Sequence, residues 1–596
     1  MSGLNRRFRL AGVAALLVLL LATAVMSQSQ GVAQESSGQR QGPATPAALG
    51  PAVPPEVTSN ANDWPVPMQN YAAHRAAPNS PITSANVGNL TKAWTVPITT
   101  SGAFGSLTSV PLVVGDTIYL QDMQSNVYAI DRTSGQVKWE TQYNVPTEGP
   151  NGVAIGYGML YGALGNNAEV FALDANTGQQ VWRIKLSYNE GIGVDMVPTV
   201  YDNIVYVSTV PGTSKQFYQG GQKGILYALD AKTGQELWEF DTTTDNLWGN
   251  PRANSGGGLW YPPSVDDQGN LYFGVGNAAP WPGTKEYPNG SSRPGDNDYA
   301  SSIVSLDPKT GGVRWYQNAK PHDLFDLDFQ LTPMIATVKI DGKDTKIAIG
   351  SGKLGKVIAY NADTGDVLWT TSVGMHKNDD TQNIPEGQTI EVYPGPLGGV
   401  ETPMAFADGT IYAPVVNLAG QYTSNNFVRT NFKYGKATGD LVAINAADGK
   451  VKWDAKIPTM VLGGAVVAND VVFTSGLDGI VRGFSTETGQ QVWSYQAPAG
   501  VNAPLVVVGD MLLVPAGGFL FPSATQAAGA EATPASSANA PAATPAAAPA
   551  PQPALIAFRL SSTGAATPAV AASPAVVASP AVPAASPAAP VATVVT

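Results

Sequence analysis

Short stretches of alternating apolar and polar residues recur along most of the chain, and each ends in the same kind of turn. In the clearest copies an alternating strand leads to an Asp, Asn or Ser, then to a glycine, and then to a second strand that carries a tryptophan. Alternation with a period of two is typical of half-buried β-strands, so each copy predicts a β-hairpin. The seven copies, each quoted up to its tryptophan, are AIDRTSGQVKW (Trp139), ALDANTGQQVW (Trp182), ALDAKTGQELW (Trp238), SLDPKTGGVRW (Trp315), AYNADTGDVLW (Trp369), AINAADGKVKW (Trp453) and GFSTETGQQVW (Trp493).

The repeated phrase has a physical explanation, which its third copy illustrates. Asp230 can accept hydrogen bonds from turn N–H groups, and Gly234 can adopt the positive φ that the reversal requires. Trp238 follows on the next strand, where a large flat indole can fill the gap between neighbouring sheets. Trp94, in NLTKAW, marks an eighth equivalent strand without the turn. Repeats at this spacing predict an all-β fold, an eight-bladed β-propeller.

The spacing of the repeats and the composition between them predict the domain boundaries. The ring is expected over residues 62–522 together with 554–561, because 555–560 (LIAFRL) is an alternating strand inside a low-complexity region. The Ala/Pro-rich residues 523–553 and the Ala/Ser/Pro-rich residues 562–596 are expected to form a disordered insertion and a disordered tail. Two tryptophan-to-tryptophan intervals, 238–315 and 369–453, are longer than the others, and such extra length usually forms loops over one face, where sites are built.

The N-terminal residues predict export. Arg6, Arg7 and Arg9 precede an apolar run, residues 10–26, and small polar residues follow. This layout is typical of a secretory signal, so we expect a signal peptide over residues 1–30, a disordered linker over 31–61, and a secreted, periplasmic or cell-envelope protein. The alternative is an uncleaved membrane anchor, because the apolar run is nearly long enough to span a bilayer.

Charge and cysteine content exclude several classes of function. The chain has 596 residues, a net charge of −12 and no basic cluster beyond its N-terminus, so we expect no nucleic-acid partner. It contains no cysteine, which excludes disulfides, thiolate metal ligands, thiol nucleophiles and a CxxCH haem site.

Several segments outside the hairpins resemble the PQQ-dependent (quinoprotein) alcohol dehydrogenase family, PQQ being pyrroloquinoline quinone. The likeness begins with the opening segment at residues 63–94 and extends over roughly residues 62–522 and the strand at 555–560. Its most specific part comprises LYFGVGNAAPW (271–281), RPGDNDYASSIVSLDPKTG (293–311) and PHDLFDLD (321–328), in the family's order. The resemblance implies a PQQ-repeat propeller that oxidises an alcohol or a sugar with PQQ and a Ca²⁺ or lanthanide ion.

The resemblance also implies roles for five residues. Asn277 matches a metal-binding amide, and Asp326 matches the catalytic aspartate, which is also a metal ligand and takes the alcohol proton. Asp328 matches the additional carboxylate of the lanthanide-dependent branch. Lys353, in GSGKLGKVIAY, stands where a cation contacts the quinone oxygens, and Trp260 resembles the indole that stacks on the cofactor ring. These residue types suit the chemistry, because hard cations prefer oxygen ligands, a carboxylate can act as a general base, and a planar cofactor suits an aromatic floor.

The same five residues also have purely structural interpretations. Asn277 is then a turn asparagine, Asp326 and Asp328 are loop-capping or solvated acids, Trp260 is part of the core, and Lys353 is an exposed surface lysine. His322, within PHD, is expected to be a structural hydrogen-bonding residue.

This chain departs from the family pattern at the cofactor end of the predicted site. Gln219 stands where the family has a Glu metal ligand, so the predicted cofactor contact there is a neutral amide with lower affinity for a hard cation. The arginine of the family's N-R-G motif is missing from residues 150–153, and residues 400–401 (Val-Glu) replace an N-W pair. The family's disulfide of adjacent cysteines is missing too.

Two functions remain open at the level of sequence. One is an exported PQQ-dependent oxidoreductase that acts on a small alcohol or sugar and passes electrons to a separate cytochrome or quinone. The other is a non-catalytic PQQ-repeat propeller that serves as a protein-binding scaffold in the cell envelope.

Overall fold

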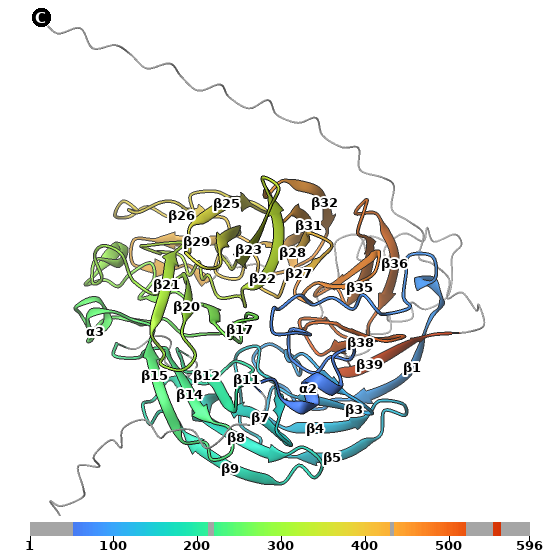
Figure 1. The fold of residues 1–596 in the computed structure, drawn as a ribbon. Helices are drawn as coiled ribbons and strands as arrows, with labels where there is room; N and C mark the ends of the chain where they lie inside the picture. The colour runs from blue at the N-terminus through green and yellow to red at the C-terminus, as the bar shows by residue number, and fades with distance from the viewer. Residues whose placement is uncertain (1–51, 213–219, 430–433, 520–551, 562–596) are drawn as a thin grey trace, which may run out of the picture. The chain divides into compact units, whose positions relative to one another are not determined.

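The computed structural model describes residues 52–212, 220–429, 434–519 and 552–561. Residue contacts divide the chain into two units, Met1–Ala48 and Leu49–Thr596, and all the described residues belong to the second. In these residues, eight four-stranded antiparallel sheets surround a common centre (Figure 1). The predicted all-β propeller class is confirmed, and the number of four-stranded sheets matches the number of tryptophan-marked positions.

Each sheet runs from an inner strand near the centre to a partly exposed outer strand at the edge. From the inner to the outer strand, the sheets are β2 (Leu112–Val114), β3 (Thr117–Gln121), β4 (Val127–Asp131) and β5 (Val137–Thr141); β6 (Ala154–Gly156), β7 (Met159–Leu164), β8 (Glu169–Asp174) and β9 (Gln180–Lys185); β11 (Thr199–Tyr201), β12 (Ile204–Ser208), β14 (Ile225–Asp230) and β15 (Glu236–Asp241); β17 (Ser264–Val265), β18 (Leu271–Gly274), β20 (Ser302–Leu306) and β21 (Val313–Asn318); β22 (Met334–Ile340), β23 (Lys343–Gly350), β24 (Lys356–Asn361) and β25 (Val367–Ser372); β27 (Ala405–Ala407), β28 (Thr410–Asn417), β31 (Thr438–Asn445) and β32 (Val451–Ile457); β33 (Val466–Ala468), β34 (Val471–Ser475), β35 (Ile480–Ser485) and β36 (Gln491–Gln496); and β37 (Val506–Val508), β38 (Met511–Ala516), β39 (Ala554–Leu560) and β1 (Leu90–Pro97).

The last of these sheets closes the ring, because it joins strands from both ends of the chain. Strand β1 pairs antiparallel with β39, in the register Leu90↔Leu560, and β39 pairs with β38. The alternating segment 555–560 is therefore an inner partner of the N-terminal strand. The two ends of the chain are thus held in one sheet, and each sheet of the ring keeps only a short outer edge.

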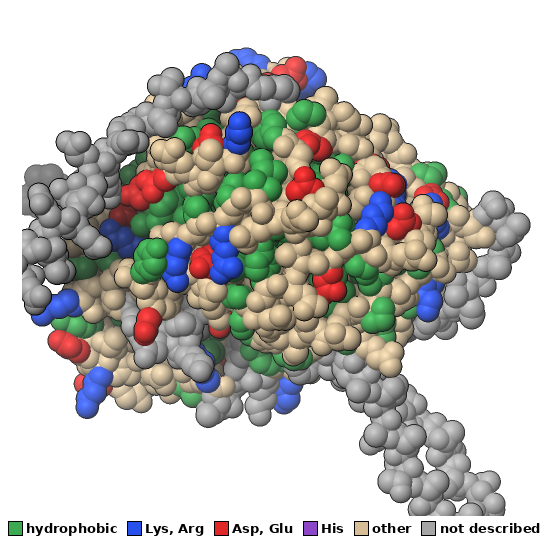
Figure 2. All heavy atoms as spheres, turned by 90° about the horizontal axis from the view of Figure 1, so that it is seen from below, with side chains coloured by type: hydrophobic (Ala, Val, Ile, Leu, Met, Phe, Trp, Pro, Cys, Tyr) green, Lys and Arg blue, Asp and Glu red, His purple; other side chains and the backbone are tan. Residues whose placement is uncertain are grey.

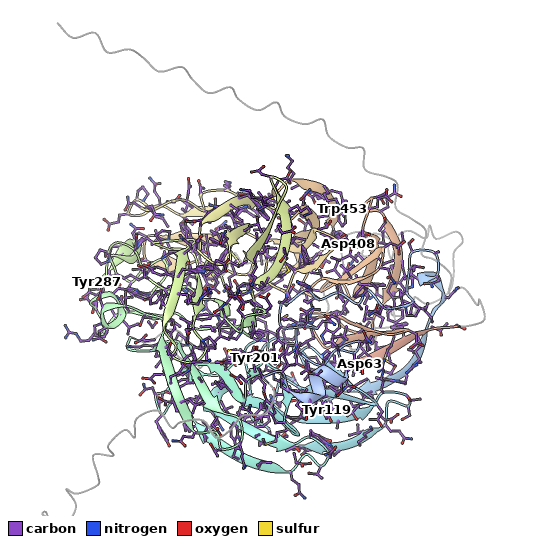
Figure 3. All side chains as sticks on the ribbon, in the orientation of Figure 1. Asp63, Tyr119, Tyr201, Tyr287, Asp408 and Trp453 are labelled. Atoms are coloured by element: carbon purple, nitrogen blue, oxygen red, sulfur yellow. The ribbon has the colours of Figure 1, made fainter. Side chains whose placement is uncertain are left out.

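The repeated tryptophans hold each sheet to the next one. Each lies on an outer strand, as Trp453 does on β32 (Figure 3), and the Trp453 indole N–H donates to Thr486 O of the following sheet at 2.9 Å. The turn glycine of that sheet, Gly489, has a φ of 69°, and a Cβ there would lie 2.7 Å from the Trp453 ring. The same indole-on-glycine contact occurs for Trp94, Trp139, Trp182, Trp238, Trp315 and Trp369. The glycine therefore serves both the turn and the close approach of the indole.

The N-terminal strap, which we define as residues 62–82, crosses the inner ends of the sheets. Its backbone bonds to one inner strand after another, through the atom pairs Trp64 N–Val113 O, Tyr71 O–Val265 N, Ala72 O–Ile335 N, His74 O–Phe406 N and Ala77 N–Val467 O. Arg75, with an exposed fraction of 0%, donates to Ala465 O and Leu505 O at 2.9 and 2.8 Å. The strap thus joins sheets from opposite sides of the ring.

The predicted disordered linker, residues 31–61, is wrong at its C-terminal end. Residues 52–61 are ordered, with helix α2 (Pro55–Ser59), the buried Val57, and Glu56 accepting N–H bonds from Tyr157 and Gly158. The physical reason is that two prolines preorganise the start of the helix, and one apolar and one acidic side chain anchor it. Composition alone did not reveal these contacts.

Smaller elements lie between the strands of the sheets. They are the paired strands β10 (Ile192–Gly193) and β13 (Val210–Pro211), β16 (Ser255–Gly256) and β19 (Ala278–Ala279), the three-stranded β26 (Ile390–Val392), β29 (Gly420–Thr423) and β30 (Asn426–Phe427), the helix α3 (Asp245–Trp248), and the 3₁₀ helices Val87–Asn89, Gly165–Asn167, Pro288–Gly290 and Tyr434–Lys436. No helix within the described residues has the length and apolarity needed to cross a membrane. On the face in Figure 2, acidic and basic side chains are interspersed rather than gathered into one field.

Candidate active site

A cavity of about 320 Å³ lies at the ring axis. Its wall includes residues that precede the first strands of several sheets, such as Thr108 before β2, Gly149 before β6 and Gln330 before β22. Tyr261 also lines it and packs in one apolar cluster with Met68 and Ala73 of the strap. The strap therefore supports one side of the cavity, which we call the central cavity.

The segment at residues 321–328 brings two aspartates to the cavity wall. Asp323 accepts N–H bonds from Phe325 at 2.9 Å and from Leu327 at 2.7 Å, so its carboxylate fixes the loop from within. Phe325 and Leu327 are fully buried, while Asp326 and Asp328 line the cavity. Asp326 has a φ of 64°, a left-handed conformation that aspartate tolerates better than most residues. The loop therefore buries its apolar side chains and places Asp326 and Asp328 at the cavity wall.

Lys353 joins the two aspartates. It lies in the turn between β23 and β24, and its ammonium Nζ is 3.0 Å from Asp326 Oδ2 and 2.7 Å from Asp328 Oδ2. Its backbone N–H donates to Gln330 Oε1 at 3.2 Å. Asp326 Oδ1 is buried and has no hydrogen-bond partner among the described residues. A cation thus already stands between two carboxylates, and one carboxylate oxygen is left available.

Asn277 and Trp260 lie around this ion-paired group. Asn277 has an exposed fraction of 3% and stands just behind the cavity wall, where its backbone N–H donates to Asp328 Oδ1 at 2.5 Å. Trp260 lines the cavity. A Cβ at Gly149 would lie 3.0 Å from the Trp260 ring, and one at Gly276 would lie 3.3 Å from its Nε1 and 3.4 Å from Asp328 Oδ1. Bare backbone therefore fits closely around the indole.

Acidic side chains outnumber basic ones in the cavity wall. Its described lining residues include Glu148, Asp326, Asp328 and Glu401, with Lys353 as the cation. Burial raises the pKa of Asp326 and of Asp328, although Lys353 acts in the opposite direction on both. Burial also raises the pKa of Glu401 to about 8 and that of Glu148 to about 7. Low solvation, rather than hydrogen bonding, dominates the electrostatics of this site.

The structure brings together Trp260, Asn277, Asp326, Asp328 and Lys353, the residues that the sequence selected. Gln219 lies outside the described residues. His322, as expected, makes structural hydrogen bonds, with its ring nitrogens near Gly295 O and Asn289 O. No three His, Cys, Asp or Glu side chains of the described ranges converge, as they stand, into a ligand set for one metal ion.

Sequence reasoning missed the roles of two acids in the cavity, Glu148 and Glu401. In the sequence, Glu401 stands out only as part of the Val-Glu pair that departs from the family pattern, and that departure is the available signal. Glu148 precedes the 150–153 segment, where an arginine is missing, but nothing in its own sequence context marks it.

The fold and the site together define a PQQ-repeat β-propeller with a carboxylate-rich cavity at its axis. The family model "Glucose/ethanol/alcohol dehydrogenase, beta-propeller domain" matches residues 64–161 and 187–375, and the model "Outer membrane protein assembly factor BamB" matches residues 419–533.

Similar proteins agree with this class. The chain is 28% identical to the putative dehydrogenase XoxF of Paracoccus denitrificans, over 74% of this chain and 84% of that protein. It is 26% identical to the lanthanide-dependent methanol dehydrogenase of Methylorubrum extorquens, over 72% and 82%. The structure of the quinohemoprotein alcohol dehydrogenase from Comamonas testosteroni has a TM-score of 0.70 at 21% identity, with coverage of 86% and 83%. The chain thus resembles quinoprotein alcohol dehydrogenases in sequence and shares their β-propeller fold.

Proposed function

We propose that this chain is an exported quinoprotein oxidoreductase that oxidises the CH–OH group of an alcohol or sugar, with PQQ and a Ca²⁺ or lanthanide ion. The observation that carries the proposal is the buried, unpartnered Asp326 Oδ1 at the wall of the central cavity, next to Lys353. The names of its relatives as dehydrogenases, one of them lanthanide-dependent, support the proposal.

The residues present fit a metal ion and a planar cofactor. Asp326, Asp328 and the Asn277 side chain offer only oxygen to a hard cation, and the Lys353 ammonium between the two aspartates indicates that positive charge is stable there. Trp260 offers an indole with bare glycine backbone beside it. Asn277, Asp326 and Asp328 would hold the ion, and Lys353 and Trp260 the quinone. When bound, the quinone accepts the hydride of the alcohol, and the ion acts as a Lewis acid.

Asp326 is the proposed general base. Asp326 would take the hydroxyl proton of the alcohol, while the bound quinone would supply the acceptor for the hydride and its two electrons, so that the product is a carbonyl compound. Burial strengthens Asp326 as a base because it raises the pKa of this carboxyl, and Lys353 keeps the other carboxylate oxygen in place. A separate cytochrome or quinone must then take the two electrons.

The proposed location is the periplasm or another exported compartment. The charged and apolar N-terminal sequence supports it, although those residues lie outside the described part of the structure.

The test is reconstitution of the purified protein with PQQ and either ion, followed by dye-linked oxidation of alcohols. Asp326→Asn should reduce kcat at least about 100-fold, because it removes the base. Asparagine also tolerates the positive φ of residue 326, so the fold should persist. Asp408→Asn, at an exposed turn of the β27–β28 hairpin (Figure 3), is the matched control and should leave kcat unchanged. Equal activity of the two variants would contradict the role of Asp326.

The scaffold alternative does not account for the cavity. A protein-binding propeller has no need for buried carboxylates around an axial cavity, since uncompensated buried charge is destabilising. Failure of the protein to bind PQQ with either ion would nevertheless favour the scaffold.

A further inference from the structure

Two acids of the central cavity have no place in the proposed chemistry. With Asn277, Asp326 and Asp328 assigned to the ion, and Lys353 and Trp260 to the cofactor, Glu148 and Glu401 remain. Neither of these acids forms an ion pair within the described ranges of the chain. The one lysine among the described lining residues is already bonded to the two aspartates. The cavity therefore keeps two acids that no cation of the described residues pairs with.

Glu401 is the better placed of the two acids. Its Oε2 accepts a long hydrogen bond of 3.4 Å from Gln330 Nε2, whereas its Oε1 is shielded from solvent and has no partner among the described residues. The backbone carbonyl of Glu401 accepts from the Tyr261 hydroxyl at 2.9 Å, so the residue is held in position. An unpartnered buried carboxylate oxygen is costly unless a donor or a cation occupies the space beside it.

The rest of the wall offers little to a charged or polar ligand but much to an aliphatic chain. Leu397, Met460, Leu462 and Leu477 line the cavity, and Phe104 and Tyr434 add aromatic surface. Aromatic faces attract cations, and aliphatic walls suit a short methylene chain. The ligand that satisfies all of these features is short, aliphatic and positively charged, with N–H donors for Glu401.

We propose that the preferred substrate is a short alcohol that also carries a protonated amine, with the ammonium group bound by Glu401 and assisted by Glu148. This inference rests on the proposed oxidoreductase function, because it names the substrate class of the same cavity. The oxidised group is still the CH–OH carbon, and the amine is a binding group that does not react. Glu401 is thus a specificity-determining residue and not a catalytic one.

The test compares 3-amino-1-propanol with 1-butanol, in which a methyl group replaces the ammonium group at nearly the same size. With the PQQ- and ion-loaded protein, kcat/KM should favour the amino alcohol at least about tenfold, since one favourable charge pair in a partly desolvated site easily reaches that factor. The preference should lie mainly in KM and should weaken with added salt.

Variants of the two acids test which of them causes the preference for the amino alcohol. Glu401→Gln should remove most of the preference for the amino alcohol through KM, and Glu148→Gln should remove a smaller part. Glu239→Gln, exposed on the outer strand β15, is the matched control and should keep the full preference. Direct calorimetric titration of 3-amino-1-propanol into the loaded protein and into Glu401→Gln gives a readout that is independent of turnover.

The outcomes separate the two proposals. Equal kcat/KM for both alcohols, or a preference that survives Glu401→Gln, overturns the substrate inference and leaves the oxidoreductase function standing. A Glu401→Gln variant that binds Tb³⁺ more weakly but keeps its preference for the amino alcohol also overturns the inference, because Glu401 then serves the ion. If the loaded protein oxidises no alcohol, the proposed function fails, and the substrate inference fails with it.

Discussion

Replacement of Lys353 by methionine tests directly how the site is held together. Methionine keeps much of the aliphatic stem but removes the ammonium group that lies 3.0 Å from Asp326 Oδ2 and 2.7 Å from Asp328 Oδ2. Both carboxylates are almost completely buried, so the variant retains two neighbouring acids without a counter-charge. Removing one partner from a buried ion pair costs about 3–5 kcal/mol of the free energy of unfolding, whereas an exposed pair contributes about 0–1 kcal/mol.

The loss of free energy of unfolding in Lys353→Met should depend on pH. Burial raises the pKa of Asp326 and of Asp328 above their values in the unfolded chain, and Lys353 opposes that rise. Without Lys353 both pKa values rise further. A carboxyl whose folded pKa is raised contributes stability that is fully present below its unfolded pKa, and the contribution is lost as pH rises through the folded pKa. Lys353→Met should therefore cost more of the free energy of unfolding at pH 8 than at pH 5.

The assay is urea unfolding, followed by tryptophan fluorescence, at pH 5 and at pH 8. The control is Lys339→Met, because Lys339 pairs with Asp344 at 2.8 Å while about 70% of each side chain is exposed. The control should change the free energy of unfolding by less than about 1 kcal/mol at either pH. The reasoning is refuted if Lys353→Met costs no more than the control, or if its cost is the same at both pH values.

Three further predictions follow from the fold and the site. Gly449→Ala should destabilise the ring by about 2 kcal/mol more than Gly342→Ala, because a Cβ at Gly449 would lie 2.6 Å from Trp369, whereas Gly342 has a similar φ and open space; equal urea midpoints would contradict this. Asp323→Asn should weaken Tb³⁺ binding at least about tenfold, as it loosens the loop that presents Asp326; unchanged terbium luminescence titrations would show that the loop stays in place. The stability of the unliganded protein should fall between pH 5 and pH 8 less steeply in Glu401→Gln than in the parent, because burial raises the pKa of Glu401 to about 8; parallel stability profiles in urea would argue against that shift.

Much of the fold could be predicted because the residues that determine each hairpin lie close together in sequence. Each repeat places an acidic or amide residue, a glycine and a tryptophan at fixed spacing, and all three act within one turn or against the adjacent sheet. Asp230 accepts the Thr233 N–H at 2.8 Å, as its turn position suggests. By contrast, the order within residues 52–61 depends on contacts of Val57 and Glu56 with a distant sheet, so composition favoured a linker.

The candidate site, like the fold, could be predicted only in part from the sequence. Asp326, Asp328 and Lys353 could be selected because their motifs are specific, and the structure brings them within ion-pair distance. Glu148 and Glu401 could not be assigned to the cavity, because nothing along the chain tells which residues of the connecting loops end at the ring axis. Only the closed ring determines that segments far apart in sequence share one cavity.

The charge of the cavity links the departures from the family pattern to one another. Where the family pattern has an arginine (residues 150–153) and a tryptophan (residues 400–401), this chain has neither, and the acids Glu148 and Glu401 line the cavity. Both differences leave the cavity with acids that no cation of the described residues pairs with. A site that only lost its cofactor would gain stability by replacing such acids with apolar residues, since a buried polar group without a hydrogen-bond partner is destabilising. Retention of Glu401 with an unpartnered oxygen is therefore better explained by a cationic ligand than by decay of the pocket.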